Sequence, residues 1–149
     1  MHNLSVRRGT LTPEEIPKIR EPATVSYKIL SQLPFSGPLA KVPEIAASHH
    51  EKLNGKGYPR GLTAKELTLE ARILAVADIF EALTAPDRPY KDPTPLSRVL
   101  RIIGFMVSDG ELDGELVAFA IQSGVLDEYA MSEINEAQRD VVLAEAFTP

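Results

Sequence analysis

The sequence predicts an all-α protein, and two observations support this. Hydrophobic residues recur at intervals of three and four, most clearly over residues 69–85, as they do along one face of a helix. The alternation of apolar and polar residues that marks a β-strand does not persist anywhere in the chain. With 149 residues, 44% of them hydrophobic, the chain is long enough to bury one core, so we expect a single domain over residues 1–149.

Composition argues against several classes of function. The net charge of −5 argues against a nucleic-acid polymer or an anionic membrane as the main partner. The chain has no cysteine, which excludes disulfides and thiolate metal ligands. It has neither an apolar signal-peptide core near its start nor an apolar run of membrane-spanning length. We therefore expect a soluble, cytoplasmic protein.

The first elements are short because proline interrupts them. Residues 1–11 are polar and basic and are expected to be an extended lead-in. Residues 12–15 (Thr-Pro-Glu-Glu) have the pattern of a helix start, with Thr as N-cap, Pro at the first helical position and Glu closing a capping box. Pro17 and Pro22 lack the amide hydrogen that a helix interior needs, so this helix should end near Glu21.

A second helix is predicted over residues 23–33, with four apolar side chains directed toward the core: Val25, Tyr27, Ile29 and Leu30. A turn-rich loop follows at residues 34–38. Pro43 then suits the first turn of a helix that leads into His49 and His50. Asn54-Gly55 supplies the left-handed residue that commonly ends a helix.

The helix over residues 69–85 is the clearest element, and Thr68 is its expected N-cap after a loop at 54–67. Its apolar residues should form one buried stripe: Leu69, Ile73, Val76, Phe80 and Leu83. A second stripe consists of small residues and one acid: Ala71, Ala75, Asp78 and Ala82. Because alanine lets another helix approach closely, Asp78 should be paired or bound to a metal rather than buried alone.

The C-terminal part is also predicted to be helical. Residues 86–95 form a loop, and three helices follow at 95–107, 113–123 and 132–147. Gly124 should end the second of these, and Ser132 should begin the third. No internal repeat or low-complexity tract is present.

Two of the three histidines are adjacent, at positions 49 and 50. Each imidazole offers a neutral nitrogen on a short, stiff side chain, which suits a metal site. Two glycines and a proline follow within nine residues, so a loop should complete the pocket. We expect Asp78 to lie opposite the two histidines as a third ligand. The alternatives are a pair of surface histidines, and a structural carboxylate at Asp78 bonded to one of them.

Beyond these local patterns, the chain resembles the HD-GYP domain over about residues 9–120, without gaps over 49–84. The resemblance is carried by six short motifs: His49-His50-Glu51, Gly57-Tyr58-Pro59, Gly61-Leu62, Ala71-Arg72-Ile73, Ala77-Asp78 and Arg88-Pro89-Tyr90. HD-GYP domains are all-α members of the HD phosphohydrolase superfamily. They bind two or three metals, often iron or manganese, and hydrolyse cyclic di-GMP or a related cyclic dinucleotide in bacterial signalling.

The resemblance implies a role for several residues. The implied metal ligands are His49, His50 and Asp78. The basic residues Arg88 and Lys91 fall where the family contacts the substrate phosphate. The signature loop, which serves pocket shape and protein contacts, consists of Gly57, Tyr58 and Pro59. The implied architecture is a helical HD-domain-like bundle, with further helices at residues 113–147.

The sequence also departs from the family. The family's defining His-Asp pair, with its nearby lysine, is absent, since no His-Asp dipeptide occurs in the chain. By the alignment the pair would lie before residue 1, so we expect a bundle incomplete at its N-terminus. Glu21 aligns with a further family histidine and is a possible oxygen ligand, and Asn54 occupies a position usually held by aspartate. We therefore expect at most one metal site, with an empty site as the alternative.

Three hypotheses of function follow. The first is an active cyclic-dinucleotide phosphodiesterase. The second, which we favour, is a degenerate module that binds a cyclic dinucleotide or a signalling protein such as a diguanylate cyclase domain. The third is a fragment whose missing helices come from another chain or an upstream region. Missing ligands predict negligible hydrolysis by the chain alone, and they argue equally against another HD-superfamily nucleotide phosphohydrolase. An apolar groove left uncovered should favour a homo-oligomer.

Overall fold

The computed structural model describes residues 25–85 and 94–146. It confirms the all-α fold class: the described part contains helices, one isolated β-bridge between Asn54 and Thr63, and no strand. The labelled elements are η2 (Gly37–Leu39), α2 (Val42–Ala47), α3 (Leu69–Thr84), α4 (Leu96–Ser108), α5 (Gly114–Gln122), α6 (Val125–Glu133), η3 (Glu136–Gln138) and α7 (Leu143–Ala146). The helix expected near residues 12–21, and with it Glu21, lies outside the described residues, as do Arg88 and Lys91.

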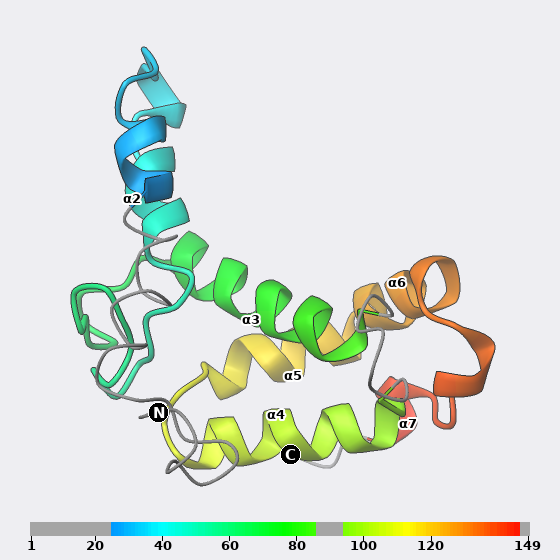
Figure 1. Ribbon diagram of the computed structural model, residues 1–149. Coiled ribbons are helices and arrows are strands. Elements are labelled where there is room, and N and C mark those ends of the chain that lie inside the picture. The colour runs from blue at the N-terminus through cyan, green and yellow to red at the C-terminus, as the bar shows by residue number, and fades with distance from the viewer. Residues whose placement is uncertain (1–24, 86–93, 147–149) are drawn as a thin grey trace, which may run out of the picture.

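The core lies where α3 packs against α4 and α5, with α6 and α7 closing one end (Figure 1). Its largest members are almost fully buried: Phe80, Leu96, Val99, Ile103, Val117, Ile121 and Leu143. α4 and α5 begin and end within one or two residues of their predicted bounds. Within residues 25–85 and 94–146, no helix has both the length and the apolar character needed to cross a bilayer.

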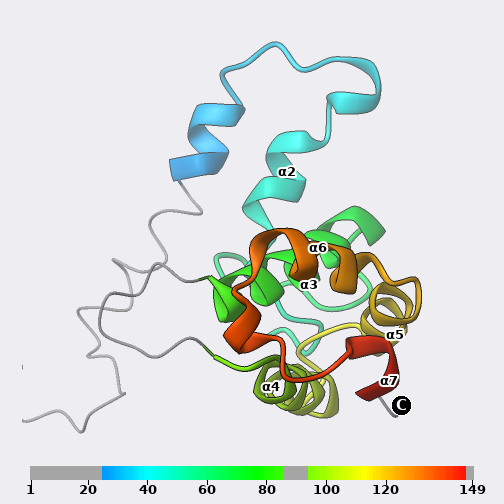
Figure 2. The same cartoon turned by 90° about the vertical axis from the view of Figure 1, so that its right-hand side faces the viewer.

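Residues 25–47 form an arm that projects from this body (Figures 1 and 2). Residues 25–30 are helical, as predicted, but Val25, Tyr27 and Ile29 are exposed. The expectation that they face the core was wrong because this segment runs alongside α2, away from the body formed by α3 to α7. At the base of the arm α2 contacts α3, so the end of α2 lies beside that helix.

α3 confirms the predicted long helix, and Thr68 caps it by accepting a hydrogen bond from the amide of Ala71 (3.3 Å). The predicted buried stripe is only half right. Its C-terminal part is buried, but Leu69 and Ile73 are 58% and 49% exposed. No described element covers the first two turns of that face, so its apolar residues line a groove instead of the core.

The last predicted helix was wrong. Ser132 lies in the final turn of α6 rather than at a helix start, and the chain beyond it forms η3 and the short α7. Gly124, at φ +79°, is itself the N-cap of α6, so the helix begins immediately after the turn. The carboxylate of Asp127 then accepts hydrogen bonds from the amides of Leu143 (2.9 Å) and Ala144 (3.2 Å), which fixes where α7 begins.

Candidate metal centre

The two histidines follow directly on the end of α2. The helix ends at Ala47, and His49 and His50 occupy the turn after it, as predicted. Asn54-Gly55 does not end a helix, contrary to expectation: Gly55 is left-handed (φ +75°) but lies in the following loop. The backbone leaves α2 earlier because the amides of Ser48 and Glu51 close successive turns onto Ile45 and Ser48.

The structure brings His49, His50 and Asp78 together. One ligand atom from each lies within 4.8 Å of the other two, and all three residues are half-buried. The two imidazole rings are 3.9 Å apart between centroids. The contact of α2 with α3 produces this approach, since Asp78 lies midway along α3. The predicted juxtaposition is therefore confirmed, while the role of these residues as ligands stays a prediction.

The chemistry of the three side chains fits a divalent metal. The Nδ1 atom of His49 lies 2.5 Å from the carbonyl oxygen of Ala46, and a carbonyl only accepts, so Nδ1 is the donor and Nε2 is the nitrogen left for a metal. This outer hydrogen bond is the usual support of a metal-binding histidine. Burial lowers the pKa of the His50 imidazole and the neighbouring His49 lowers it further, while Asp78 acts in the opposite direction. Two imidazoles and one carboxylate suit Fe²⁺, Mn²⁺ or Zn²⁺ with positions left open.

The loop carrying Gly57, Tyr58 and Pro59 folds back over the histidines. The amide of Tyr58 donates to the carbonyl of His50 (3.2 Å), and the two rings are 4.8 Å apart between centroids. The peptide bond between Tyr58 and Pro59 is cis. The predicted signature loop thus forms one wall beside the metal group.

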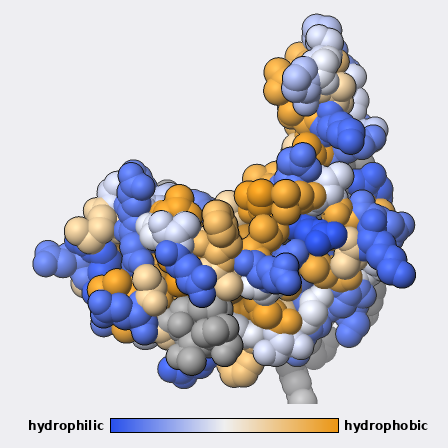
Figure 3. Space-filling model, turned by 180° about the vertical axis from the view of Figure 1, so that it is seen from behind, coloured by the Kyte–Doolittle hydropathy of each residue, from blue (hydrophilic) through white to orange (hydrophobic). Residues whose placement is uncertain are grey.

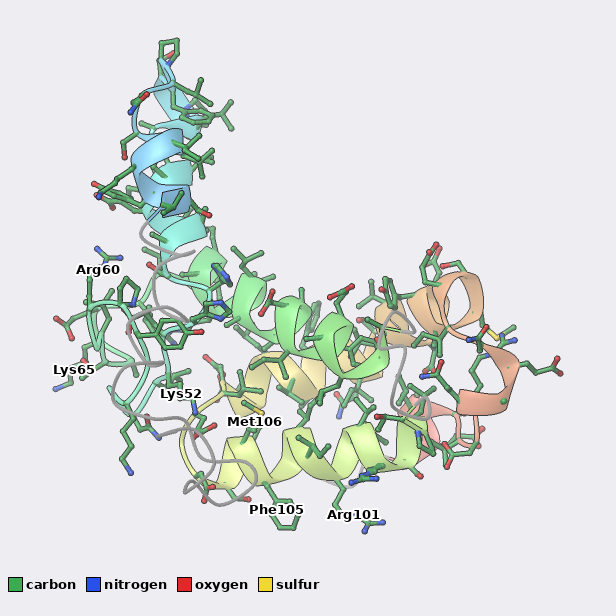
Figure 4. The ribbon with its side chains drawn as sticks, viewed as in Figure 1. Lys52, Arg60, Lys65, Arg101, Phe105 and Met106 are labelled. Atoms are coloured by element: carbon green, nitrogen blue, oxygen red, sulfur yellow. The ribbon has the colours of Figure 1, made fainter. Side chains whose placement is uncertain are left out.

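Sequence reasoning missed two residues that hold this loop. Glu51 is 3% exposed, and its carboxylate accepts hydrogen bonds from the amides of Arg60 (2.7 Å) and Leu62 (2.9 Å). The guanidinium of Arg60 donates to the hydroxyl of Ser48 (2.7 Å), and Figure 4 shows the Arg60 side chain at the outer side of the loop. A glutamate directly after two histidines was the available signal for Glu51. Nothing in the sequence marked Arg60.

A second set of contacts ties the same loop to the turn between α4 and α5. Lys52 forms an ion pair with Glu111 (2.6 Å), and it points from the loop toward that turn (Figure 4). The side-chain amide of Asn54 donates to the carbonyl of Asp109 (3.0 Å), while its oxygen accepts from the amide of Lys56 (3.0 Å). The loop is therefore attached to the helical body as well as to the histidines.

An apolar groove of about 870 Å³ lies between α3, α5 and α6, and Asp78 is on its lining. Its exposed apolar residues include Leu69, Ile73, Phe119 and Val125. Figure 3 shows hydrophobic surface gathered beside the base of the arm on this side of the molecule. Of the three candidate ligands, Asp78 is the one that lines this groove.

Comparison with known proteins shows the family to which the chain belongs. A family model for the HD domain matches residues 1–116, so the chain belongs to the HD-domain family. HD domains are metal-dependent, which agrees with the grouping of His49, His50 and Asp78. Similar proteins include phosphodiesterases of cyclic dinucleotides, and this similarity confirms an HD-GYP-like domain within that family.

Three relatives illustrate the similarity. A cyclic di-GMP phosphodiesterase of Thermotoga maritima is 41% identical over 99 residues, which cover 66% of this chain and 26% of that protein. The 3′3′-cGAMP-specific phosphodiesterase 1 of Vibrio cholerae is 47% identical over 75 residues, 50% of this chain and 17% of that protein. A cyclic di-GMP phosphodiesterase of Pseudomonas aeruginosa is 32% identical over 136 residues, 91% of this chain and 32% of that protein. The chain therefore spans between 17% and 32% of the length of these relatives.

Proposed function

We propose that this chain is a degenerate HD-GYP module of bacterial signalling that binds one divalent metal and a cyclic dinucleotide without hydrolysing it. The observation that carries the proposal is the approach of His49, His50 and Asp78 to within 4.8 Å, beside the loop that contains Tyr58. The relatives named above act on cyclic di-GMP or 3′3′-cGAMP, which indicates the class of ligand.

The proposed division of roles follows the chemistry of each group. His49, His50 and Asp78 would hold iron or manganese, and a metal bound there supplies positive charge for a phosphate oxygen. Arg88 and Lys91, which lie outside the described residues, are proposed to contact the nucleotide phosphates. Glu21 is proposed only as a further oxygen ligand. The exposed edge of the signature loop at Pro59 is the proposed contact for a diguanylate cyclase-type signalling protein.

Binding without hydrolysis follows from the ligand set. A two-metal centre clamps both the attacking and the leaving oxygen of the phosphate, and it needs a carboxylate or another group that bridges the metals. The printed sequence has no His-Asp dipeptide, and the three candidate ligands that residues 25–85 and 94–146 bring together would hold at most one metal. The alternative is an active cyclic di-GMP phosphodiesterase in which another chain or an upstream region supplies the remaining ligands.

Titration of the purified chain tests this function. We expect calorimetric binding of Mn²⁺, binding of cyclic di-GMP or 3′3′-cGAMP in its presence, and no linear dinucleotide after prolonged incubation. Manganese-dependent turnover by the chain alone would refute the degenerate site and favour the alternative. If metal binds but neither nucleotide does, the protein-binding role alone remains.

The Asp78→Asn variant tests the metal group directly. Removing the carboxylate of the group formed by His49, His50 and Asp78 should lower the affinity for Mn²⁺ by more than about 100-fold, beyond the usual effect of losing an outer-shell partner. The matched control is Glu81→Gln: this residue lies one turn further along α3 and lines the same groove, but it is outside the metal group. Equal loss of affinity in both variants, measured by calorimetry, would show that Asp78 is not a ligand.

The homo-oligomer expected from the sequence stays a prediction, and the groove is where a second copy would pack. Contiguous exposed apolar surface is a feature of many interfaces, and a two-fold dimer covers the same patch on both subunits. Light scattering should therefore find a dimer in the wild type and a monomer in Phe119→Ser, in which a 69% exposed groove side chain is removed. Phe105→Ser is the control, since Phe105 is 65% exposed on the outer face of α4 (Figure 4). A wild-type monomer at high concentration would contradict the prediction.

A further inference from the structure

Glu51 is a buried carboxylate whose two backbone partners lie directly after the signature loop. Both oxygens accept backbone amides, from residues nine and eleven positions later in the chain. Over residues 25–85 and 94–146, no cation forms an ion pair with it. Burying a charged carboxylate is unfavourable unless it is hydrogen-bonded, and bonds from amides to a charged acceptor are among the stronger ones. The loop amides therefore stabilise Glu51, and Glu51 in turn fixes the loop.

The segment that Glu51 fixes is the one that contacts His50. Its two partners, Arg60 and Leu62, lie two to five positions after Gly57 and Tyr58, the loop residues that approach the histidine segment. Among those residues, Gly57 lies so close that a β-carbon there would be 2.4 Å from the α-carbon of Glu51, and Tyr58 contacts His50 through its amide and its ring. The His50 ring thus has His49 on one side and Tyr58 nearby on another.

The core of the protein is separate from this arrangement. The buried hydrophobic cluster is formed by α3 to α7 and does not include Glu51 or the loop. A change at Glu51 should therefore alter the loop and the orientation of His50 without unfolding the helical body. Metal affinity and global stability are expected to respond differently, which separates positioning from a general structural role.

We propose that Glu51 is a positioning residue: by holding the amides of Arg60 and Leu62 it fixes Tyr58 against His50 and so sets the affinity of the metal group. This inference rests on the proposed metal binding. It adds that the loop and the metal group are coupled, so a molecule that binds the loop changes metal affinity, and metal binding changes the affinity for that molecule by the same factor.

The Glu51→Gln variant of the full chain tests the inference. A glutamine keeps the shape but has only one acceptor oxygen, so its NH₂ group faces one of the two amides. Amide hydrogen exchange at Arg60 or Leu62 should accelerate by at least about tenfold, the effect of losing a hydrogen bond to a charged group. Affinity for Mn²⁺ should fall by about 10- to 100-fold, while the thermal midpoint changes little.

Glu66→Gln is the matched control. Glu66 lies in the same loop and also accepts from a backbone amide, that of Thr63 (2.9 Å), but it is exposed and does not belong to the metal group. It should leave Mn²⁺ affinity unchanged. Unchanged exchange and unchanged affinity in Glu51→Gln, or an equal fall in affinity in Glu66→Gln, would overturn the inference.

Two further outcomes remain decisive. If Glu51→Gln does not fold, Tyr58→Leu tests the second step, because it removes the ring beside His50 and leaves both bonds of Glu51 in place. It should lower Mn²⁺ affinity with exchange at Arg60 and Leu62 unchanged, and undiminished affinity would overturn the inference. If the wild type binds no metal, the proposed function fails, while the exchange comparison still decides whether Glu51 holds the loop.

Discussion

Replacing Gly57 with alanine is expected to displace the signature loop and reduce metal affinity by more than about 100-fold, beyond the loss of one supporting contact. A β-carbon at this position would lie 2.4 Å from the α-carbon of Glu51 and 2.4 Å from the amide nitrogen of Lys52. Both are backbone atoms, so no side-chain rotation relieves the clash and the loop must move. Because the amide and ring of Tyr58 contact His50, the movement reaches the metal group.

Gly104→Ala is the control for this variant. Gly104 lies within α4, and a β-carbon there meets no atom within 4 Å. Alanine in a helix interior should stabilise the protein by about 0.5–1 kcal/mol, so its thermal midpoint should rise slightly with metal affinity unchanged. Calorimetry and thermal unfolding of both variants check the prediction. A Gly57→Ala variant with wild-type affinity for Mn²⁺ would contradict it.

The second large effect is expected at Phe80, whose replacement by alanine should lower the free energy of unfolding by about 3–5 kcal/mol. The side chain is 2% exposed at the centre of the α3 to α7 cluster and packs edge-to-face on Tyr129, with ring centroids 5.9 Å apart. Since domains of this size are stable by only about 5–15 kcal/mol, the loss is a large fraction of the total.

Denaturant unfolding measures this effect, with Phe105→Ala as the control. The same substitution at a 65% exposed position on α4 should change the free energy of unfolding by less than about 0.5 kcal/mol. Equal destabilisation by the two substitutions would mean that Phe80 is not a core residue. Retained Mn²⁺ binding in a folded Phe80→Ala would show that the metal group tolerates a weakened core.

The features that sequence predicted well depend on local signals. α3 has a polar N-cap, a 3.6-residue pattern and no internal proline, and these features are sufficient whatever surrounds the helix. The approach of Asp78 to the histidines was predicted because an acid in a small-residue stripe needs a partner. In both cases the physical requirement is contained in a few neighbouring residues.

The predictions that failed required knowledge of the surroundings. Leu69 and Ile73 have the periodicity of core residues, but periodicity does not show whether another element covers that face. Ser132 is a good N-cap in isolation, yet Gly124 had already begun a helix that includes it. The role of Glu51 was missed because its partners are backbone amides, which every residue except proline has, so no residue type reveals them.

The side-chain amide of Asn54 makes a hydrogen bond that the aspartate expected there from the family resemblance could not make. A charged aspartate at this position would have no hydrogen to give to the carbonyl of Asp109, whereas the asparagine NH₂ group donates to it across 3.0 Å. Together with the ion pair of Lys52 with Glu111, this contact ties the segment that follows the two histidines to the turn after α4. The backbone beside the histidines is therefore anchored at two places, on the turn after α4 through Lys52 and Asn54 and on its own amides through Glu51.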